Sequence, residues 1–271
     1  MYSAKRKMQP AHPCYCALAD RAARAIVGRN LIPMTRQQLS DLREKGFSVI
    51  PRVFDFDELE YLKGELSLIA PSDAVRRRGE TFAIRDLLEA CPAVRNLAES
   101  SRIRSLVSPI LGDDAFAVRS LLFDKTAEAN WLVPWHQDMT ICVAEKREAP
   151  GYGPWSIKAG QWHVQPPTAV LERMLSVRVH LDRCDESNGA LRVIPSTHNH
   201  GRMNPNDVRH AEETNGISIC SVESGGVLLL LPLLVHASSP ARNPAHRRVI
   251  HIDFANSELH GGLSWRTRKS S

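Results

Sequence analysis

The chain has 271 residues, of which 43% are hydrophobic and 24% charged, and its 35 Lys and Arg stand against 30 Asp and Glu. This composition is ordinary for a globular protein and favours neither disorder nor a membrane span. The longest apolar run, 227–235, is broken by Pro232 and is shorter than the roughly 20 residues of a transmembrane helix. We therefore expect no membrane partner.

Charge and cysteine patterns exclude two further classes. The basic residues are scattered among carboxylates, which is not the stripe expected of a nucleic-acid-binding protein. The six cysteines include no CxxC pair, and the N-terminus lacks the apolar segment of a secretory signal. We expect a reduced, cytoplasmic protein with an N-terminal extension at 1–33 and a single domain at 34–271.

The chain that follows the extension is predicted to begin with helices. Apolar residues recur at spacings of three and four, as on the buried face of an amphipathic helix. Thr35 is a typical N-cap, and Gly46 is a typical residue after a helix end. The predicted elements are a helix at 35–45, a strand at 47–51, and helices at 55–69, 93–100 and 102–110.

From about residue 115 the pattern changes to alternating polar and apolar residues with many β-branched and aromatic side chains. Several short strands without intervening helices favour a jelly roll over a parallel sheet. The fold class is therefore mainly β with flanking helices (α+β), around a double-stranded β-helix, or cupin-like jelly-roll, core. The predicted strands are 115–124, 131–135, 174–181, 190–194, 217–222, 226–231 and 249–254.

A candidate metal site begins at the tripeptide His136-Gln137-Asp138. Residues i and i+2 of a strand point to the same face, so the imidazole and the carboxylate lie side by side. His236 follows the most apolar strand region and could supply a third ligand. Two histidines and one carboxylate leave three positions of an octahedral iron(II) open, enough for a bidentate 2-oxo acid and O2. A lone HxD also arises by chance, and a histidine in a β core is often only hydrogen-bonded.

The residues after His236 strengthen this interpretation. Ser238 lies two residues and Arg247 eleven residues further along the chain. A 2-oxoglutarate bound to iron by its 2-oxo acid end needs a cation for its distal carboxylate, and the planar guanidinium of arginine offers two parallel donors.

Over residues 34–256 the sequence resembles the phytanoyl-CoA dioxygenase-like hydroxylases, a branch of the iron(II)- and 2-oxoglutarate-dependent oxygenases. The motifs that carry the resemblance are PWHQD at 134–138, LDRCDESNGALRVIPSTH at 181–198 and HASSPARNPAHRR at 236–248. The resemblance implies catalytic iron(II) on His136, Asp138 and His236, with O2 as oxidant. It also implies 2-oxoglutarate on Arg247, Ser238 and Lys125.

Further candidate residues lie outside these motifs. Arg178 occupies a strand position that faces the cofactor in relatives, although the alternating polar face around it could also be solvent-exposed. Arg119 corresponds roughly to a substrate-contacting position. The segment 139–173 is long for a loop and carries Trp155 and Trp162, which could bind substrate or only anchor the segment.

The predicted reaction is hydroxylation of a C–H bond in a small molecule, with release of succinate and CO2. Candidate substrates are an amino acid derivative, an acyl thioester or a natural-product intermediate. Related halogenases carry a small residue in place of the carboxylate ligand, so Asp138 disfavours halogenation, whereas desaturation, cyclisation or epimerisation could use the same ligands. Two alternatives remain open: a non-catalytic jelly-roll binding or sensing protein, and a zinc or manganese cupin enzyme.

Overall fold

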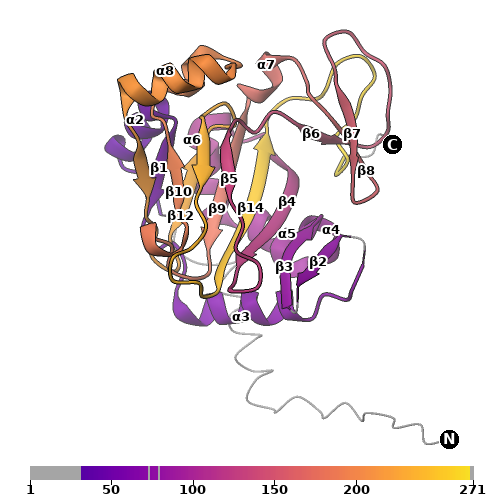
Figure 1. Cartoon of the computed structure of the whole chain (residues 1–271). Coiled ribbons are helices and arrows are strands. Elements are labelled where there is room, and N and C mark those ends of the chain that lie inside the picture. Colours follow the sequence, from indigo (N-terminus) through magenta and orange to yellow (C-terminus); the bar gives the residue numbers. More distant parts are fainter. Residues whose placement is uncertain (1–31, 73, 79, 269–271) are drawn as a thin grey trace, which may run out of the picture.

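Two antiparallel sheets form the centre of the structure, with helices packed on one side (Figure 1). The computed structural model describes residues 32–72, 74–78 and 80–268. Most of the predicted N-terminal extension, residues 1–31, lies outside this range, and the proposed division of the chain at residue 34 stays a prediction.

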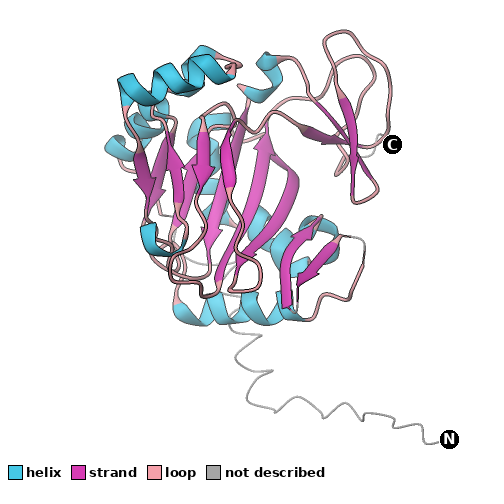
Figure 2. Ribbon diagram, viewed as in Figure 1, coloured by secondary structure: helices cyan, strands magenta, loops and turns pink. Residues whose placement is uncertain are grey.

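The larger sheet has seven strands in the order β1-β12-β9-β14-β4-β3-β2, and the smaller has four in the order β11-β10-β13-β5. A third, peripheral sheet has the order β6-β8-β7. Figure 2 distinguishes these strands from the helices. The large sheet contains β1 (Phe47–Ile50), β12 (Val227–Leu230), β9 (Met174–His180), β14 (Arg247–Ala255), β4 (Phe116–Lys125), β3 (Glu80–Arg85) and β2 (Val75–Arg78). The small sheet contains β11 (Ser218–Cys220), β10 (Leu191–Val193), β13 (His236–Ser238) and β5 (Val133–His136). The peripheral sheet contains β6 (Ile141–Val143), β8 (Gln161–Val164) and β7 (Trp155–Lys158).

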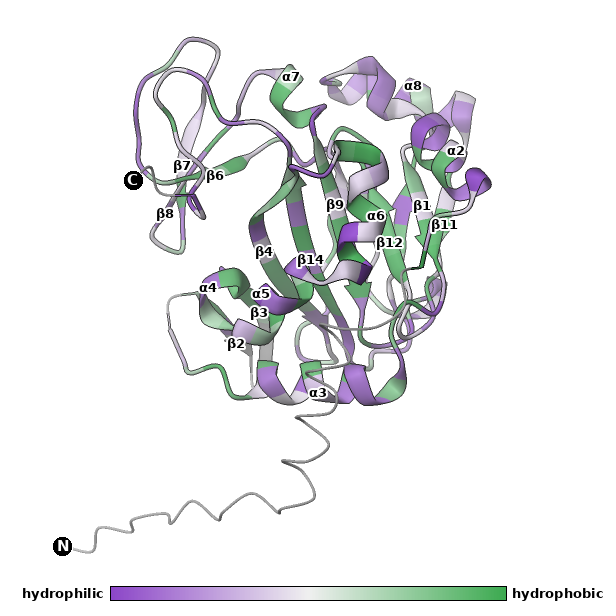
Figure 3. Cartoon of the chain, turned by 180° about the vertical axis from the view of Figure 1, so that it is seen from behind, coloured by the Kyte–Doolittle hydropathy of each residue, from purple (hydrophilic) through white to green (hydrophobic). Residues whose placement is uncertain are grey.

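The helices are α2 (Arg36–Lys45), α3 (Phe56–Ser67), α4 (Leu87–Ala90), α5 (Pro92–Glu99), α6 (Ser101–Leu111), α7 (Thr168–Leu171) and α8 (Pro205–Asn215), with short 3-10 turns η1 (Glu186–Asn188) and η2 (Thr197–His200). Viewed from behind, α6 lies in front of the large sheet and α3 runs below its lower end (Figure 3). Residues of α3, α5 and α6 pack in one apolar cluster with residues of β9, β12 and β14. Within the described residues, every helix is too short or too polar to cross a lipid bilayer.

Strand β9 separates the main core from the space between the sheets. Val177 and Val179 belong to the apolar cluster that includes Leu62 of α3 and Leu106 of α6. The alternate positions, which include Arg178, face the other way, yet all seven residues of β9 are buried. The polar face of β9 is therefore turned into the interior of the jelly roll and not to solvent.

The predicted fold class is confirmed, and the predicted elements correspond to observed ones with shifts of a few residues at their ends. Thr35 caps α2 through a capping box with Gln38. The elements that the sequence did not predict are the β2–β3 hairpin, the sheet β6–β8 and α7 within the segment 139–173, and α4, α8 and β13. Strands of three or four residues are too short for a clear period, and α8 buries only Ala211, so it lacks an apolar stripe.

Candidate metal centre and active site

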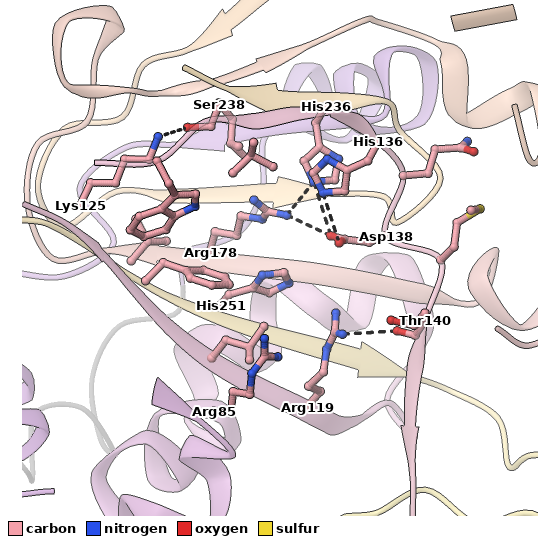
Figure 4. A pocket seen from close by; sticks show the side chains of 18 of the residues that line it. Arg85, Arg119, Lys125, His136, Asp138, Thr140, Arg178, His236, Ser238 and His251 are labelled. Atoms are coloured by element: carbon pink, nitrogen blue, oxygen red, sulfur yellow. Dashed lines mark hydrogen bonds and ion pairs between the residues drawn. The ribbon is translucent and has the colours of Figure 1, made fainter. Parts of the chain in front are cut away.

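A cavity of about 420 Å³ lies between the two main sheets and is the candidate active site (Figure 4). Side chains of β4, β9 and β14 line it on the large-sheet side, and β5 and β13 contribute the facing wall. Among the lining residues only Asp138 is acidic, whereas six are cationic: Arg85, Arg119, Lys125, Lys158, Arg178 and Arg247. The cavity is therefore strongly basic.

The three predicted metal ligands come together in this cavity. His136 ends β5, His236 begins β13, and the two residues are paired in register, with their ring centroids 4.2 Å apart. The Asp138 carboxylate lies 3.9 Å from Nε2 of His136 and 3.6 Å from Nε2 of His236. One nitrogen or oxygen atom from each residue lies within 4.8 Å of the other two, a spacing that can accommodate one metal ion.

Hydrogen bonds orient both imidazoles toward this common point. Nδ1 of His136 lies 2.9 Å from the carbonyl oxygen of Pro134, and Nδ1 of His236 lies 2.9 Å from that of Leu234. With the Nδ1 proton donated to a backbone carbonyl, Nε2 carries the lone pair that can bind a metal. In His236 this Nε2 also lies 3.4 Å from Nη2 of Arg178. The intervening Gln137 turns away and ties neighbouring loops together through its side-chain amide.

Electrostatics keep the triad in a metal-binding protonation state. Burial alone would raise the pKa of Asp138, but interaction with His236, which is charged only in acid, and with the permanent charge of Arg178 outweighs it and lowers that pKa. At pH 7 Arg178 is the cation beside Asp138 that favours the ionised carboxylate. Burial also lowers the pKa of His236, so its imidazole is neutral at pH 7. Arg178 donates a hydrogen bond of 3.1 Å to Oδ2 of Asp138, which places this predicted cofactor residue beside the triad.

The predicted 2-oxoglutarate residues form a second cluster. Lys125 of β4 and Arg247 of β14 are cross-strand partners, and their side chains are only 1% and 6% exposed. Lys125 Nζ donates to Ser238 Oγ at 2.8 Å, and Arg247 Nη1 donates to the carbonyl of Gly189 at 3.1 Å. No carboxylate in the described part of the chain pairs with either cation. Burial and the charge of Arg247 lower the pKa of Lys125 to about 7.

Several buried polar atoms near this cluster have no hydrogen-bond partner among the described residues. They are both ring nitrogens of His180 and the Nε atoms of Arg178 and Arg247. Burial and the charge of Arg247 lower the pKa of His180 to about 3, so its ring is neutral and retains one N–H donor at pH 7. Buried polar groups are nearly always satisfied, so these donors fit an elongated anionic ligand, such as 2-oxoglutarate, in the cavity.

Arg119 lies at the opposite end of the cavity from Lys125. Its Nε donates to Asp253 at 2.6 Å and its Nη1 donates to the carbonyl of Thr140 at 3.3 Å. Trp155 and Trp162, in contrast, do not line the cavity; their rings pack against each other with centroids 6.3 Å apart. This placement favours the interpretation that the two tryptophans anchor the peripheral sheet.

Sequence reasoning missed four titratable residues of the cavity: Arg85, Lys158, His180 and His251. Arg85 and Lys158 lie on strands that were not predicted, so no pattern marked them as inward-facing. The other two lie on predicted strands, and the period-two alternation with Arg178 was the signal that could have identified His180.

An antiparallel jelly roll that presents two histidines and one carboxylate to an open cavity defines the class of non-haem iron(II) oxygenases. Residues 42–249 match the family described as phytanoyl-CoA dioxygenase (PhyH), and the chain belongs to this family. The protein is thus a 2-oxoglutarate-dependent dioxygenase that uses iron(II) and O2.

Similar proteins agree with this placement. The ectoine dioxygenase of Bordetella bronchiseptica is 20% identical over 93% of this chain and 88% of its own length. The crystal structure of EctD from S. alaskensis with 2-oxoglutarate and 5-hydroxyectoine aligns with a TM-score of 0.65 at 19% identity, over 84% of this chain and 79% of EctD. The carbocyclase SnoK from nogalamycin biosynthesis aligns with a TM-score of 0.63 at 14% identity, over 83% and 85% of the two chains. At such identities the solved structures establish the fold alone.

Proposed function

We propose that this enzyme hydroxylates a C–H bond of a small molecule, with iron(II) held by His136, Asp138 and His236. The observation that carries the proposal is the combination, in one cavity, of this triad with two buried cations that lack a carboxylate partner in the described chain, Lys125 and Arg247. Burying charge without a counter-charge is costly, so such a pair is expected where a ligand supplies the anion.

The triad's own residues prepare the metal site before any ion binds. Backbone carbonyls set the imidazole tautomers, and Arg178 orients the carboxylate of Asp138 and favours its ionised form. When bound, iron(II) and 2-oxoglutarate supply the oxidising chemistry, in which O2 converts 2-oxoglutarate to succinate and CO2 and provides the oxygen atom of the new hydroxyl group.

The distal carboxylate of 2-oxoglutarate, remote from the metal, is assigned to the cluster around Arg247. Its guanidinium and the Lys125 ammonium would neutralise the distal carboxylate, and Ser238 holds Lys125 in place through the 2.8 Å hydrogen bond. The unpartnered ring of His180 would donate its remaining N–H to the same ligand. These contacts orient the 2-oxo acid end toward the triad.

The family does not support the two alternatives that the sequence left open. A binding or sensing protein without activity has no need of an intact triad together with uncompensated cations. A zinc or manganese cupin would accept the same three ligands but would make no use of 2-oxoglutarate.

A spectroscopic titration tests the proposal directly. Anaerobic addition of iron(II) and 2-oxoglutarate should produce a weak visible charge-transfer band, and zinc(II) in place of iron(II) should give none. Admission of O2 with a substrate should then release succinate, and ¹⁸O₂ should label the product hydroxyl. Absence of the band in protein that has demonstrably bound iron(II) would contradict the proposal.

A further inference from the structure

A second group of cations lies at the end of the cavity remote from Lys125 and Arg247. Arg85, at the end of β3, is paired in register with Leu121 of β4. Arg119 lies two residues before Leu121 on β4, so Arg85 and Arg119 share one face of the sheet. Lys158 reaches the same region from β7, where its Nζ lies 3.5 Å from Oγ1 of Thr140. Figure 4 places Arg85 and Arg119 side by side, apart from Lys125.

The carboxylates near Arg85 and Lys158 are already paired with other arginines. Asp253 accepts from Arg119 at 2.6 Å, and Asp86, the neighbour of Arg85 in sequence, lies 2.7 Å from Arg266. Arg85 and Lys158 therefore have no carboxylate partner among the described residues. Burial and the charges of Arg119 and Arg85 lower the pKa of Lys158, the pattern expected of cations that repel one another without a counter-charge.

The two cationic ends of the cavity are set apart along strand β4. Leu121, the register partner of Arg85, lies four residues from Lys125 along β4. At about 3.3 Å per residue, this is a separation of roughly 13 Å along the strand. A five-carbon dicarboxylate whose two ends are held by Arg247 and by the metal triad has no third carboxylate for Arg85.

Charge balance gives the remaining cations a role. A divalent metal ion and the 2-oxoglutarate dianion cancel each other, so the basic excess of the cavity persists in the loaded enzyme. We propose that the hydroxylated substrate is an anion, and that Arg85 and Lys158 bind its carboxylate or phosphate group while its reacting carbon faces the triad. This inference rests on the proposed function, and it names the substrate class: small acids or phosphate esters, to the exclusion of neutral and cationic compounds.

The cavity supports this class in two further respects. A volume of about 420 Å³ is at the low end for ligand pockets and must hold both 2-oxoglutarate and substrate, so the substrate is compact. Leu121 and Phe123, between the two cationic ends, offer apolar surface for a short carbon skeleton. The cavity therefore fits a substrate that has a short apolar body and one anionic end.

Anion binding is measured first, on protein saturated with nickel(II) and 2-oxoglutarate so that the co-substrate end is filled. Acetate and inorganic phosphate are titrated separately at constant ionic strength against chloride, and the melting temperature is recorded. At least one of the two anions should raise the melting temperature more than chloride does. The double variant R85M/K158M should lose this shift, while R209M, which removes an exposed arginine of α8, should retain it.

The second arm uses matched substrate pairs scored by succinate release: carboxylic acids against their carboxamides, and phosphate esters against the parent alcohols. Active compounds should carry the anionic group, and R85M/K158M should raise their KM roughly 10- to 100-fold. The kind of pair that gives activity shows whether the anionic group of the substrate is a carboxylate or a phosphate. Activity with the neutral member of a pair, or an undiminished anion shift in the double variant, would overturn the inference.

The two proposals fail in different ways. R85M/K158M should keep the charge-transfer band of the wild-type protein and its affinity for 2-oxoglutarate. If the wild type forms the band but neither probe anion shifts its melting temperature beyond chloride, only the anionic substrate is contradicted. If the wild type forms no band, the oxygenase assignment itself is contradicted.

Discussion

The two ends of the cavity are both cationic, yet they are built differently. Lys125 and Arg247 lie almost fully buried on adjacent central strands, and their position relative to the triad is set by sheet register. Arg85 and Lys158 are half-buried and come from the β2–β3 hairpin and the peripheral sheet. The first end is part of the jelly roll, whereas the second belongs to elements added at its edges.

This difference separates what the fold must preserve from what it can vary. A co-substrate that is the same in every turnover suits rigid, preorganised donors on core strands. A substrate that differs between relatives suits residues on peripheral strands, which can change without disturbing the core. Substitutions at the triad and at the co-substrate end should show whether the two ends are separable in function.

The largest effect is expected at the metal triad, on which both ends depend. His136→Ala removes a ligand that water cannot replace with the same geometry. Succinate release should fall by more than the roughly 10- to 100-fold typical for loss of a residue that only supports a ligand. His210→Ala, on exposed α8, is the matched control, and full turnover by His136→Ala would remove this residue from the centre.

The second largest effect is expected from loss of the Arg247 guanidinium at the buried, co-substrate end of the cavity. Arg247→Met should weaken 2-oxoglutarate binding by roughly 100-fold, since truncating one partner of a buried charged contact costs about 2–5 kcal/mol. Iron(II) affinity should be unchanged, and both can be measured by anaerobic titration of the charge-transfer band. Arg209→Met serves as the control. Equal weakening of iron and of 2-oxoglutarate would indicate a collapsed site and not a lost contact.

The pH dependence of 2-oxoglutarate binding should report on Lys125. Its pKa in the free protein is lowered to about 7, so above that pH the amine is neutral and must take up a proton when a dianion binds. The dissociation constant should therefore rise with pH above about 7, by up to about tenfold per unit. Calorimetry at pH 8 in buffers of different ionisation enthalpy should detect the proton uptake. In Lys125→Met the affinity should be lower and should lack this slope.

The smallest expected effect concerns the hydroxyl that holds Lys125. Ser238→Ala removes one neutral acceptor and should raise the dissociation constant of 2-oxoglutarate by about three- to fivefold. Ser239→Ala is a close control, because Ser239 contacts Lys125 only through its backbone carbonyl. If the two variants behave alike, the Ser238 side chain plays no part in co-substrate binding.

The sequence was most informative where a local rule and a chemical requirement coincide. Thr35 and Gly46 marked the ends of α2 because helix termini need specific caps, and both were found in those roles. The i and i+2 spacing of His136 and Asp138 predicted their common face, since strand geometry alone determines it. Family resemblance then pointed to Arg247 and Lys125, which the structure places together as cross-strand partners.

Long-range pairing decided the rest. The meeting of His236 with His136 depends on the pairing of β13 with β5, which joins residues one hundred positions apart. Likewise, Arg85 reaches the cavity only because the β2–β3 hairpin, whose sequence shows no clear alternation of polar and apolar residues, pairs with the edge of β4. Local sequence thus determined which residue types could bind metal and co-substrate. The register between distant strands decided which of them share a cavity, because contacts at that separation arise from the packing of whole sheets and leave no periodic trace in the chain.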